Sequence, residues 1–272
     1  MILPQISAIN EQIAEKTRMR QQQLTKPIGS LGMLETFSIQ FAGITANEHP
    51  GFHQKEVIIM AADHGITQEG VSAYPSDVTA QMVKNFLAGG AAVNVLARQA
   101  GASVSIVDIG VNYDFKQISG LHHRKIAMGT RNMLHEPAMT RAQTEAAIQV
   151  GIDIVNQRVK EGMDLVATGE MGIGNTTPSS AITAIYTNLP VEKVTGRGTG
   201  LDDAGLQQKI NVINEVICFH QPDPNDPLDV LSKVGGLEIA GLTGVILGAA
   251  SHNIPFVVDG FISGADSLIA AE

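Results

Sequence analysis

Residues 57–65 read Val57-Ile-Ile-Met-Ala-Ala-Asp-His-Gly65, and the expected architecture can be built outward from them. Six apolar residues in a row, without polar alternation, are typical of a strand that helices cover on both faces, as in a parallel sheet. An Asp-His-Gly tripeptide then ends the run. Similar apolar runs return at Val104–Ile109, Asp164–Thr168 and Phe256–Asp259, so we expect at least four such strands.

Helix-compatible stretches lie between and around these runs. We expect helices at 4–22, 34–46, 79–98, 140–160, 178–186, 203–219 and 236–250. Thr140 is a favourable N-cap residue for the long helix that follows it. Strands that alternate with helices predict an α/β fold, with a mostly parallel sheet and helices on both of its faces. Right-handed crossovers then bring the carboxyl ends of the strands to one edge of the sheet.

Composition excludes several classes of function. The 272 residues carry a net charge of −9, with 27 acidic and 18 basic side chains, and contain no run of Lys or Arg that could follow a nucleic-acid backbone. No apolar run approaches the roughly 18 residues that a membrane helix needs. The N-terminus has no features of an export signal. We therefore expect a cytoplasmic protein that binds neither nucleic acid nor membrane.

Metal and cysteine chemistry are not expected either. Cys218 is the only cysteine, which excludes an internal disulfide and a cysteine-rich metal site. Its apolar helical surroundings predict a small core residue. His122 and His123 are adjacent and would point to opposite faces of a strand, and no spacing of His, Cys and Asp matches a zinc site.

Polar or glycine-bearing tips follow the four expected strands. They are Asp63-His64-Gly65, Asp108-Ile109-Gly110, Gly169–Gly172 and Asp259-Gly260. Ligands of open α/β sheets bind outside the carboxyl ends of the strands, so these tips predict one crevice. The alternative is that each aspartate only caps the helix that follows it. Four such tips together favour a site.

Residues 169–178, Gly-Glu-Met-Gly-Ile-Gly-Asn-Thr-Thr-Pro, form the most informative tip. Glycines let a backbone approach an anion closely, and the N-terminus of a helix that starts near Pro178 favours negative charge. The turn therefore predicts a phosphate site, and the alternative is a simple glycine-rich turn capped by threonine. The carboxylate of Glu170 does not suit a phosphate site, so we expect it to bond a substrate hydroxyl or a base.

A second glycine-rich segment, Gly196–Asp203, opens a helix that carries Lys209. It matches neither the dinucleotide fingerprint nor the P-loop, because no long strand precedes it and no Gly-Lys-Ser/Thr follows. Its amides could still reach phosphate oxygens, with Lys209 as the cation for the same phosphate. The alternative is a solvated lysine on a helix surface.

Nine segments, in this order along the chain, resemble the benzimidazole phosphoribosyltransferase family. They are Lys26–Gly32, Ala62–Ile66, Gly70–Pro75, Gly89–Asn94, Glu136–Thr140, Gly169–Pro178, Gly196–Asp203, Asp229–Gly241 and Val258–Phe261. The resemblance implies a Rossmann-like parallel sheet within 47–272, the part that binds the nucleotide and the base. It also implies a small helical domain, built partly from N-terminal helices within 1–46, and a homodimer.

The resemblance further implies transfer of the 5-phosphoribosyl group of nicotinate mononucleotide to 5,6-dimethylbenzimidazole or a related base in cobalamin biosynthesis, without a metal or a cofactor. The matching phosphate and ribose ligands in this sequence are Gly172, Gly174, Asn175, Thr176, Gly198 and Lys209. The matching residues of the base pocket are Ser72, Tyr74, Gln81 and Met171. Glu170 would be a catalytic or assisting carboxylate.

One part of the family pattern has no counterpart here. The family carries its principal general base, a glutamate in a Gly-Glu-Gly-type loop, after the segment that ends at Phe261, and this sequence stops at Glu272 without that loop. Either the sequence is incomplete, or Glu170 or a partner chain must supply the base. The alternative to an active transferase is therefore a catalytically silent nucleotide-binding paralogue that pairs with an active subunit. A nicotinamide-dependent oxidoreductase is a distant third, because the first strand lacks a glycine-rich fingerprint.

Overall fold

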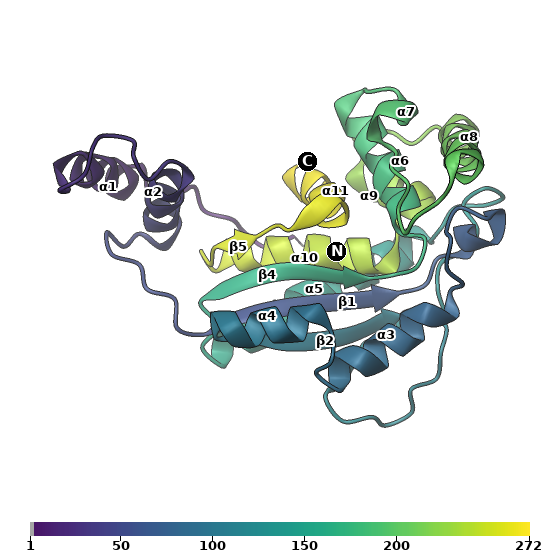
Figure 1. Ribbon diagram of the computed structural model, residues 1–272, viewed down its shortest axis with the longest axis horizontal. Helices are drawn as coiled ribbons and strands as arrows, with labels where there is room; N and C mark the ends of the chain where they lie inside the picture. Colours follow the sequence, from purple (N-terminus) through teal and green to yellow (C-terminus); the bar gives the residue numbers. More distant parts are fainter. Residues whose placement is uncertain (1–2) are drawn as a thin grey trace.

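A computed structural model describes residues 3–272 (Figure 1). Within this part of the chain, five parallel strands form one sheet in the order β3-β2-β1-β4-β5. The strands are β1 (Lys55–Ala62), β2 (Ala102–Gly110), β3 (Leu121–His123), β4 (Leu165–Met171) and β5 (Phe256–Val257). The helices are α1 (Glu11–Gln23), α2 (Met33–Thr45), the 3-10 helix η1 (Gly65–Glu69), α3 (Asp77–Leu87), α4 (Ala92–Ala100), α5 (Arg141–Lys160), α6 (Thr176–Thr187), α7 (Val191–Val194), α8 (Asp203–His220), α9 (Pro227–Val234), α10 (Leu237–Ser251) and α11 (Gly260–Ala271). The predicted α/β fold is confirmed.

Helices cover both faces of the sheet, as predicted. α3 and α4 lie on one face, and α5 and α10 lie on the other (Figure 1). Side chains along β1 alternate between the two: Ile58 and Met60 join the core under α5 and α10, whereas Ile59 and Ala61 join the core under α3. Burial of a side chain as large as Ile or Met contributes about 1.5–3 kcal/mol. Packing from both sides therefore holds the central strand in place.

Glycines bring α5 and α10 into backbone contact. A Cβ atom on Gly151 would overlap the carbonyl oxygen of Gly241, and one on Gly244 would overlap that of Ile148. Any side chain at these positions would push the two helices apart. The close packing keeps α10 against the sheet, and its first turn stays at the carboxyl ends of β1 and β4.

The N-terminal helices α1 and α2 pack against each other and lie to one side of the sheet, away from α8 (Figure 1). Asn10 caps α1, because its side chain accepts a hydrogen bond from the amide of Ile13 at 3.0 Å. The division into a small helical domain that includes 1–46 and an α/β domain at 47–272 stays a prediction. Residues 1 and 2 lie outside the part of the chain that is described.

Two of the predicted helices differ most from their expected bounds. The helix expected at 79–98 is in fact two helices, α3 and α4. Gly89 lies between them with a φ of +74°, a left-handed conformation that favours glycine and interrupts a helix. The helix expected at 4–22 begins only at Glu11, after its cap.

Strand β4 continues beyond its predicted end. We expected it to stop at Thr168, before Gly169, but it runs to Met171. Pairing with β1 sustains it, since Met60 pairs with Glu170 in the parallel register. Sheet pairing thus overrides the low strand preference of glycine. Glu170 consequently lies near the end of a rigid strand and not on a loop.

Some elements, and the burial of one residue, differ from the prediction. No strand was expected at β3, which has three residues, and no helix was expected at η1, α7, α9 or α11. Cys218 is exposed, so its assignment to the core was wrong. The buried face of α8 follows spacings of three and four residues through Lys209, Val212 and Val216, and position 218 does not belong to that series.

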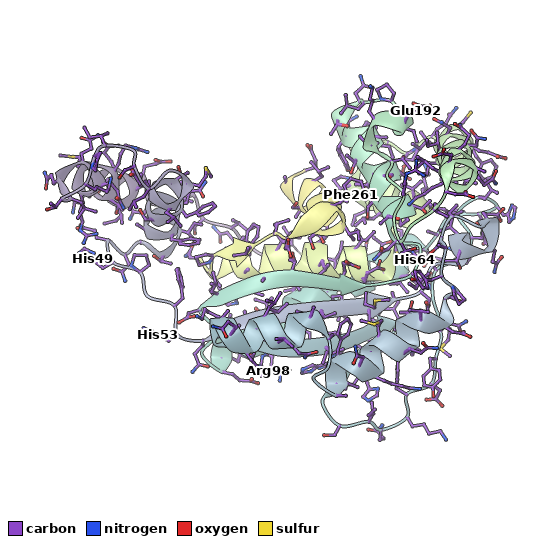
Figure 2. All side chains as sticks on the ribbon, in the orientation of Figure 1. His49, His53, His64, Arg98, Glu192 and Phe261 are labelled. Atoms are coloured by element: carbon purple, nitrogen blue, oxygen red, sulfur yellow. The ribbon has the colours of Figure 1, made fainter. Side chains whose placement is uncertain are left out.

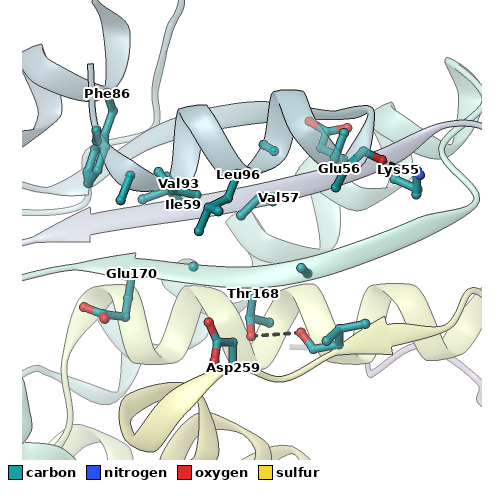
Figure 3. Close-up of a pocket in the computed structure, with 18 of the residues that line it drawn as sticks. Lys55, Glu56, Val57, Ile59, Phe86, Val93, Leu96, Thr168, Glu170 and Asp259 are labelled. Carbon is teal, nitrogen blue, oxygen red and sulfur yellow. Dashed lines mark hydrogen bonds between the residues drawn. The ribbon is translucent and has the colours of Figure 1, made fainter. Parts of the chain in front are cut away.

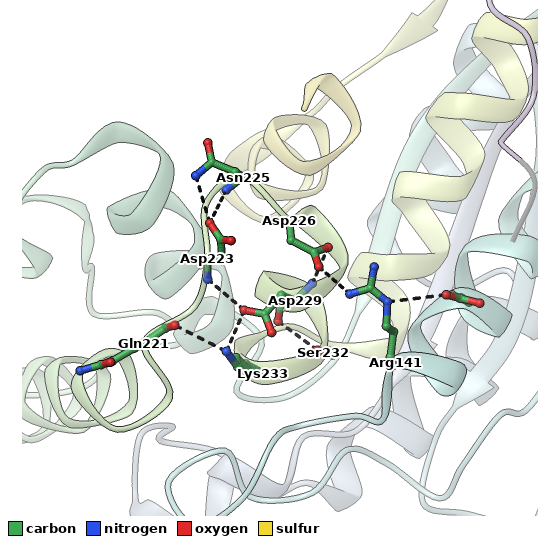
Figure 4. A network of polar contacts seen from close by, with 9 residues as sticks. Arg141, Gln221, Asp223, Asn225, Asp226, Asp229, Ser232 and Lys233 are labelled. Carbon is green, nitrogen blue, oxygen red and sulfur yellow. Dashed lines mark hydrogen bonds and ion pairs between the residues drawn. The ribbon is translucent and has the colours of Figure 1, made fainter.

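A polar network ties the start of α9 to α5 (Figure 4). Asp226 caps α9 by accepting from the amide of Asp229, and it also accepts from Arg141 Nη1 at 2.6 Å. Lys233 Nζ in turn lies 2.8 Å from Asp229 Oδ2. Because α9 leads into α10, these bonds help to place the first turn of α10 beside the crevice described below.

Candidate functional site

The carboxyl ends of β1, β2 and β4 meet at one edge of the sheet, near the base of α6 (Figure 1). The amide of Asp63 donates to the carbonyl oxygen of Gly110 at 3.0 Å, and the amide of Asn112 donates to Asp63 Oδ2 at 2.8 Å. A Cβ atom on Gly172 would lie 2.6 Å from the carbonyl oxygen of Ala62. The tips of these three strands are therefore packed together.

Asp108 has a structural position within this edge. It is almost fully buried, and its Oδ1 atom accepts from the amide of Val111 at 3.0 Å and from Lys125 Nζ at 2.9 Å. Its carboxylate stabilises the turn that follows β2. Asp108 therefore does not cap a helix, because the next element is β3; it bonds the turn and Lys125 instead.

Glu170 reaches a cavity of about 620 Å³ that extends along the sheet (Figure 3). Thr168 and Asp259 line the same cavity, so the fourth predicted tip reaches it too. Apolar side chains of β1, α3 and α4 form much of the remaining wall, among them Val57, Ile59, Phe86, Val93 and Leu96. The cavity extends across β4, because Glu170 pairs with Met60 and shares its face of the sheet, whereas the apolar side chains lie on the face of Ile59.

The surroundings of Glu170 favour its neutral form. Burial raises its pKa to about 7, a hydrogen bond donated by Asn175 Nδ2 opposes this rise, and the nearby carboxylate of Glu238 adds to it. A carboxyl group with a pKa near neutrality is partly ionised at neutral pH and binds a proton more readily than an ordinary glutamate. Glu170 therefore has the properties of a general base.

The turn that joins β4 to α6 leaves no room for side chains. Gly172 packs on β1, and Gly174 has a φ of +90°, which favours glycine. α6 begins at Thr176 and not near Pro178 as predicted. The glycines and Asn175 thus come directly before the N-terminus of a 12-residue helix, where the helix dipole favours an anion.

Lys209 of α8 points at this turn from the opposite side. Its side chain is fully buried, and Nζ donates to Thr176 Oγ1 at 2.5 Å. Burial lowers the pKa of Lys209 to about 8. No carboxylate within 4.0 Å of Nζ is found among residues 3–272. The interpretation of Lys209 as a solvated surface lysine is wrong, because its charge is buried and available to an anion.

The second glycine-rich segment covers Lys209. A Cβ atom on Gly198 would lie 3.1 Å from Thr176 Oγ1 and 3.4 Å from Lys209 Nζ. A cavity of about 440 Å³ opens between this segment and the start of α6, and Lys193 and Phe261 also line it. The proposed phosphate ligands therefore lie together on one side of the crevice.

The four residues expected at the base pocket are less closely gathered. Ser72 Oγ lies 3.4 Å from Thr199 Oγ1, which places its loop beside the second glycine-rich segment, and Tyr74 in the same loop is 53% exposed. Gln81 lines a separate polar cavity of about 280 Å³ with Asp63. Met171 packs against the core under α3. Their role in binding a base stays a prediction.

Sequence reasoning placed His64 at a strand tip of the crevice, but it missed two other buried ionisable residues near Glu170, which are Glu238 and Asp266. His64 Nε2 lies 2.6 Å from Glu238 Oε1, and both side chains are almost completely buried. Asp266 of α11 is also fully buried, and neither of its carboxylate oxygens has a hydrogen-bond partner. A signal existed for Glu238 and Asp266, because each interrupts an otherwise largely apolar helix. Spacing in the sequence could not show that both of these residues lie near Glu170.

Two absences among the described residues, 3–272, are relevant to function. No group of three His, Cys, Asp or Glu side chains in this range is arranged to hold a metal ion. None of the helices in the same range is both long and apolar enough to cross a membrane.

The fold and the crevice define a Rossmann-like α/β protein with a glycine-rich turn and a buried lysine at the carboxyl ends of its strands. A family model described as a phosphoribosyltransferase matches residues 6–272. The nicotinate-nucleotide–dimethylbenzimidazole phosphoribosyltransferase of Chloroflexus aggregans is 57% identical over 98% of this chain and 75% of its own length. The protein of that name from Geobacter sulfurreducens is 54% identical over 99% of this chain and 77% of its own.

A solved structure agrees with these relatives. The crystal structure of CobT from Thermus thermophilus superimposes with a TM-score of 0.91 at 40% identity, covering 95% of this chain and 78% of that one. This chain belongs to the nicotinate-nucleotide–dimethylbenzimidazole phosphoribosyltransferase family.

Proposed function

We propose that this chain transfers the 5-phosphoribosyl group of nicotinate mononucleotide to 5,6-dimethylbenzimidazole or a related base, a step of cobalamin biosynthesis. Relatives that share more than half of its residues carry the name of this activity. The observation that carries the proposal is the position of Lys209, a buried cation beside the start of α6. A buried charge without an opposite charge is costly, and the phosphate of the nucleotide would supply one.

The phosphate and ribose are proposed to bind where the two glycine-rich segments meet α6. Gly172 and Gly174 would let the backbone approach the ligand, Asn175 and Thr176 would donate hydrogen bonds, and Lys209 would neutralise the phosphate charge. Gly198 would close this site from the opposite side, since its Cα lies against Thr176 and Lys209.

The acceptor base is proposed to bind beside Glu170, with further contacts from loops around it. The residues assigned to it are Ser72, Tyr74, Gln81 and Met171. An apolar wall in another part of the cavity that Glu170 lines supports an aromatic acceptor, because flat rings gain most of their binding free energy from apolar burial. Movement of the loop that carries Ser72 and Tyr74 would bring these two residues closer to that ring, whereas Gln81 is fixed on α3 and Met171 on β4.

The reaction needs one bond formed, one bond broken and one proton removed. A ring nitrogen of the benzimidazole donates its lone pair to the anomeric carbon from the face opposite nicotinate, which gives the α-linked riboside. The bond between that carbon and the pyridinium nitrogen breaks, and its electron pair neutralises the pyridinium. The other ring nitrogen of the attached benzimidazole then loses its proton to Glu170. Alignment of the two rings supplies the rest of the rate enhancement.

Two finer statements stay expectations, of which only the homodimer comes from the family resemblance. We expect the chain to act as a homodimer and to act in the cytoplasm. Size-exclusion chromatography with light scattering would measure the first, and fractionation of cells that express the chain would measure the second.

The direct test is product formation. We expect the purified chain, mixed with nicotinate mononucleotide and dimethylbenzimidazole, to release nicotinate and α-ribazole 5′-phosphate in equal amounts by mass spectrometry. Lys209→Met should reduce the yield, whereas Lys160→Met, at an exposed position on α5, should not. Binding of the nucleotide without any release of nicotinate would contradict the proposal and support a silent nucleotide-binding protein.

A further inference from the structure

His64 and Glu238 form a buried ion pair beneath the crevice. They are 174 residues apart in the sequence, and the bond joins the end of β1 to the first turn of α10 at 2.6 Å. Figure 2 places His64 at the end of the sheet, below α6. Both side chains are at most 1% exposed, so solvent does not screen the pair.

Two glycines close around this bond. A Cβ atom on Gly172 would lie 3.1 Å from His64 Nε2 and 3.2 Å from Glu238 Oε1. One on Gly236 would lie 2.5 Å from His64 Cε1 and 2.8 Å from Glu238 Oε2. The pair is therefore packed directly under the turn that carries the proposed phosphate ligands.

Charged groups reach the pair from each neighbouring element. Burial lowers the pKa of His64, but the carboxylate of Glu238, together with Asp63 and Glu170, outweighs this effect and raises it. Glu238 in turn raises the pKa of Glu170, and His64 lowers it. Asp266 of α11 interacts with both glutamates. The carboxyl groups of Glu238, Asp63 and Glu170 therefore all act on the one buried imidazole of His64.

We propose that His64 is a positioning residue for the transfer reaction: its bond holds the Glu238 carboxylate out of the chemistry, so that Glu170 is the carboxyl group that exchanges a proton in the crevice. This inference rests on the proposed function in one respect, which is that the proton exchanged by Glu170 comes from the acceptor base. The geometry supports a division of roles. Glu238 Oε2 is fully buried without a hydrogen-bond partner, so among residues 3–272 the bond to His64 is the side-chain hydrogen bond that fixes this carboxylate, whereas Glu170 reaches the crevice.

Opposite effects follow for the two members of the pair. His64→Gln keeps a donor for Glu238 but removes the positive charge, so an unbalanced carboxylate should raise the proton affinity of Glu170. Glu238→Gln keeps the hydrogen bond but removes the negative charge, and the buried His64 then becomes neutral. Glu170 loses the carboxylate that faces it, and its proton affinity should fall. The double variant has a neutral hydrogen-bonded pair and should resemble Glu238→Gln.

The test measures single-turnover release of nicotinate between about pH 5 and pH 9. We expect the acidic limb of the profile to move up by about one pH unit in His64→Gln, the size of effect that a nearby like charge produces. In Glu238→Gln and in the double variant it should move down. His220→Gln is the matched control, since His220 is a buried histidine whose Nε2 lies 2.7 Å from the carbonyl oxygen of Met133. The acidic limb of the pH profile of His220→Gln should not move.

A purely structural role would lower the rate of both single variants at every pH and leave the limb in place, which would overturn the proposal, as would shifts in the same direction. A second measurement needs no activity. ¹³C NMR titration of carboxyl-labelled glutamate, with the signal of Glu170 assigned by Glu170→Gln, should show the same opposite shifts. If the wild-type chain releases no nicotinate, the proposed function fails, and this titration still supports or overturns the role of His64. If one of the two single variants does not fold, an unmoved Glu170 signal in the other variant overturns the proposed role of His64.

Discussion

The ammonium group of Lys209 lies 2.5 Å from the hydroxyl oxygen of Thr176, which joins the middle of α8 to the first residue of α6. Thr176 comes directly after the glycine-rich turn that follows β4. A buried cation and a helix N-terminus thus meet at one point, and both favour an anion. This relationship is the basis for placing the nucleotide phosphate.

The first prediction tests that placement. Lys209→Met keeps the aliphatic chain but removes the charge, so the affinity for nicotinate mononucleotide should fall by about 1.5–3 kcal/mol, the range for a charge-assisted hydrogen bond. Isothermal titration calorimetry measures it. Lys160→Met, on the exposed part of α5, should bind like the wild type. Equal affinities in all three proteins would remove Lys209 from the site.

The second prediction concerns the glycine turn. A Cβ atom on Gly172 would lie 2.6 Å from the carbonyl oxygen of Ala62, so Gly172→Ala must displace the turn. Since misplacement of about 1 Å can cost about 10²-fold in rate, we expect the rate of nicotinate release to fall by about 10- to 100-fold. Gly264→Ala, on α11, is the control, because a Cβ atom there would meet no atom within 4 Å. Similar losses in both variants would mean that the close approach at Gly172 has no special importance.

The third prediction follows from Asp266. Burial raises its pKa to about 9, and Glu170 and Glu238 contribute to the rise. The unfolded chain releases this proton near pH 4, whereas the folded chain keeps it until about pH 9. Stability from this group is therefore complete below about pH 4 and is lost as the pH rises towards 9. Asp266→Asn avoids this loss and should raise the free energy of unfolding at pH 7 by about 2–4 kcal/mol.

Urea denaturation at pH 4 and pH 7 measures this effect. The gain of Asp266→Asn should be present at pH 7 and small at pH 4. Asp153→Asn, at an exposed position on α5, should change the stability by no more than about 0.5 kcal/mol at either pH. A variant that is less stable than the wild type at pH 7 would show that Asp266 is ionised and paired in the folded protein.

Local patterns in the sequence were sufficient for much of the fold. The apolar run of β1 and the capping residue Thr140 of α5 are both where the patterns placed them, because each depends on neighbours in the chain. The break between α3 and α4 could have been inferred from Gly89-Gly90. The extension of β4 to Met171 could not, since it depends on pairing with a strand about 110 residues earlier.

The candidate site shows the same limit. The turn at 172–176 was recognisable, because glycines and hydroxyl residues before a helix have a local meaning. The burial of Lys209 and the pairing of His64 with Glu238 depend on contacts between distant segments. Polar residues within apolar helices, such as Glu238 and Asp266, were the only local indication that a buried polar cluster exists.

The most direct test of the account is the rate of a single turnover with Glu170→Gln. The wild-type chain in excess over nicotinate mononucleotide, with saturating dimethylbenzimidazole, should convert the nucleotide to α-ribazole 5′-phosphate and nicotinate. Glutamine keeps the size and the bond to Asn175 but cannot accept a proton, so the rate should fall by about 10²- to 10⁴-fold while the affinity for the nucleotide stays the same. Equal single-turnover rates for the two proteins would contradict the central claim that Glu170 takes the proton of the attacking base.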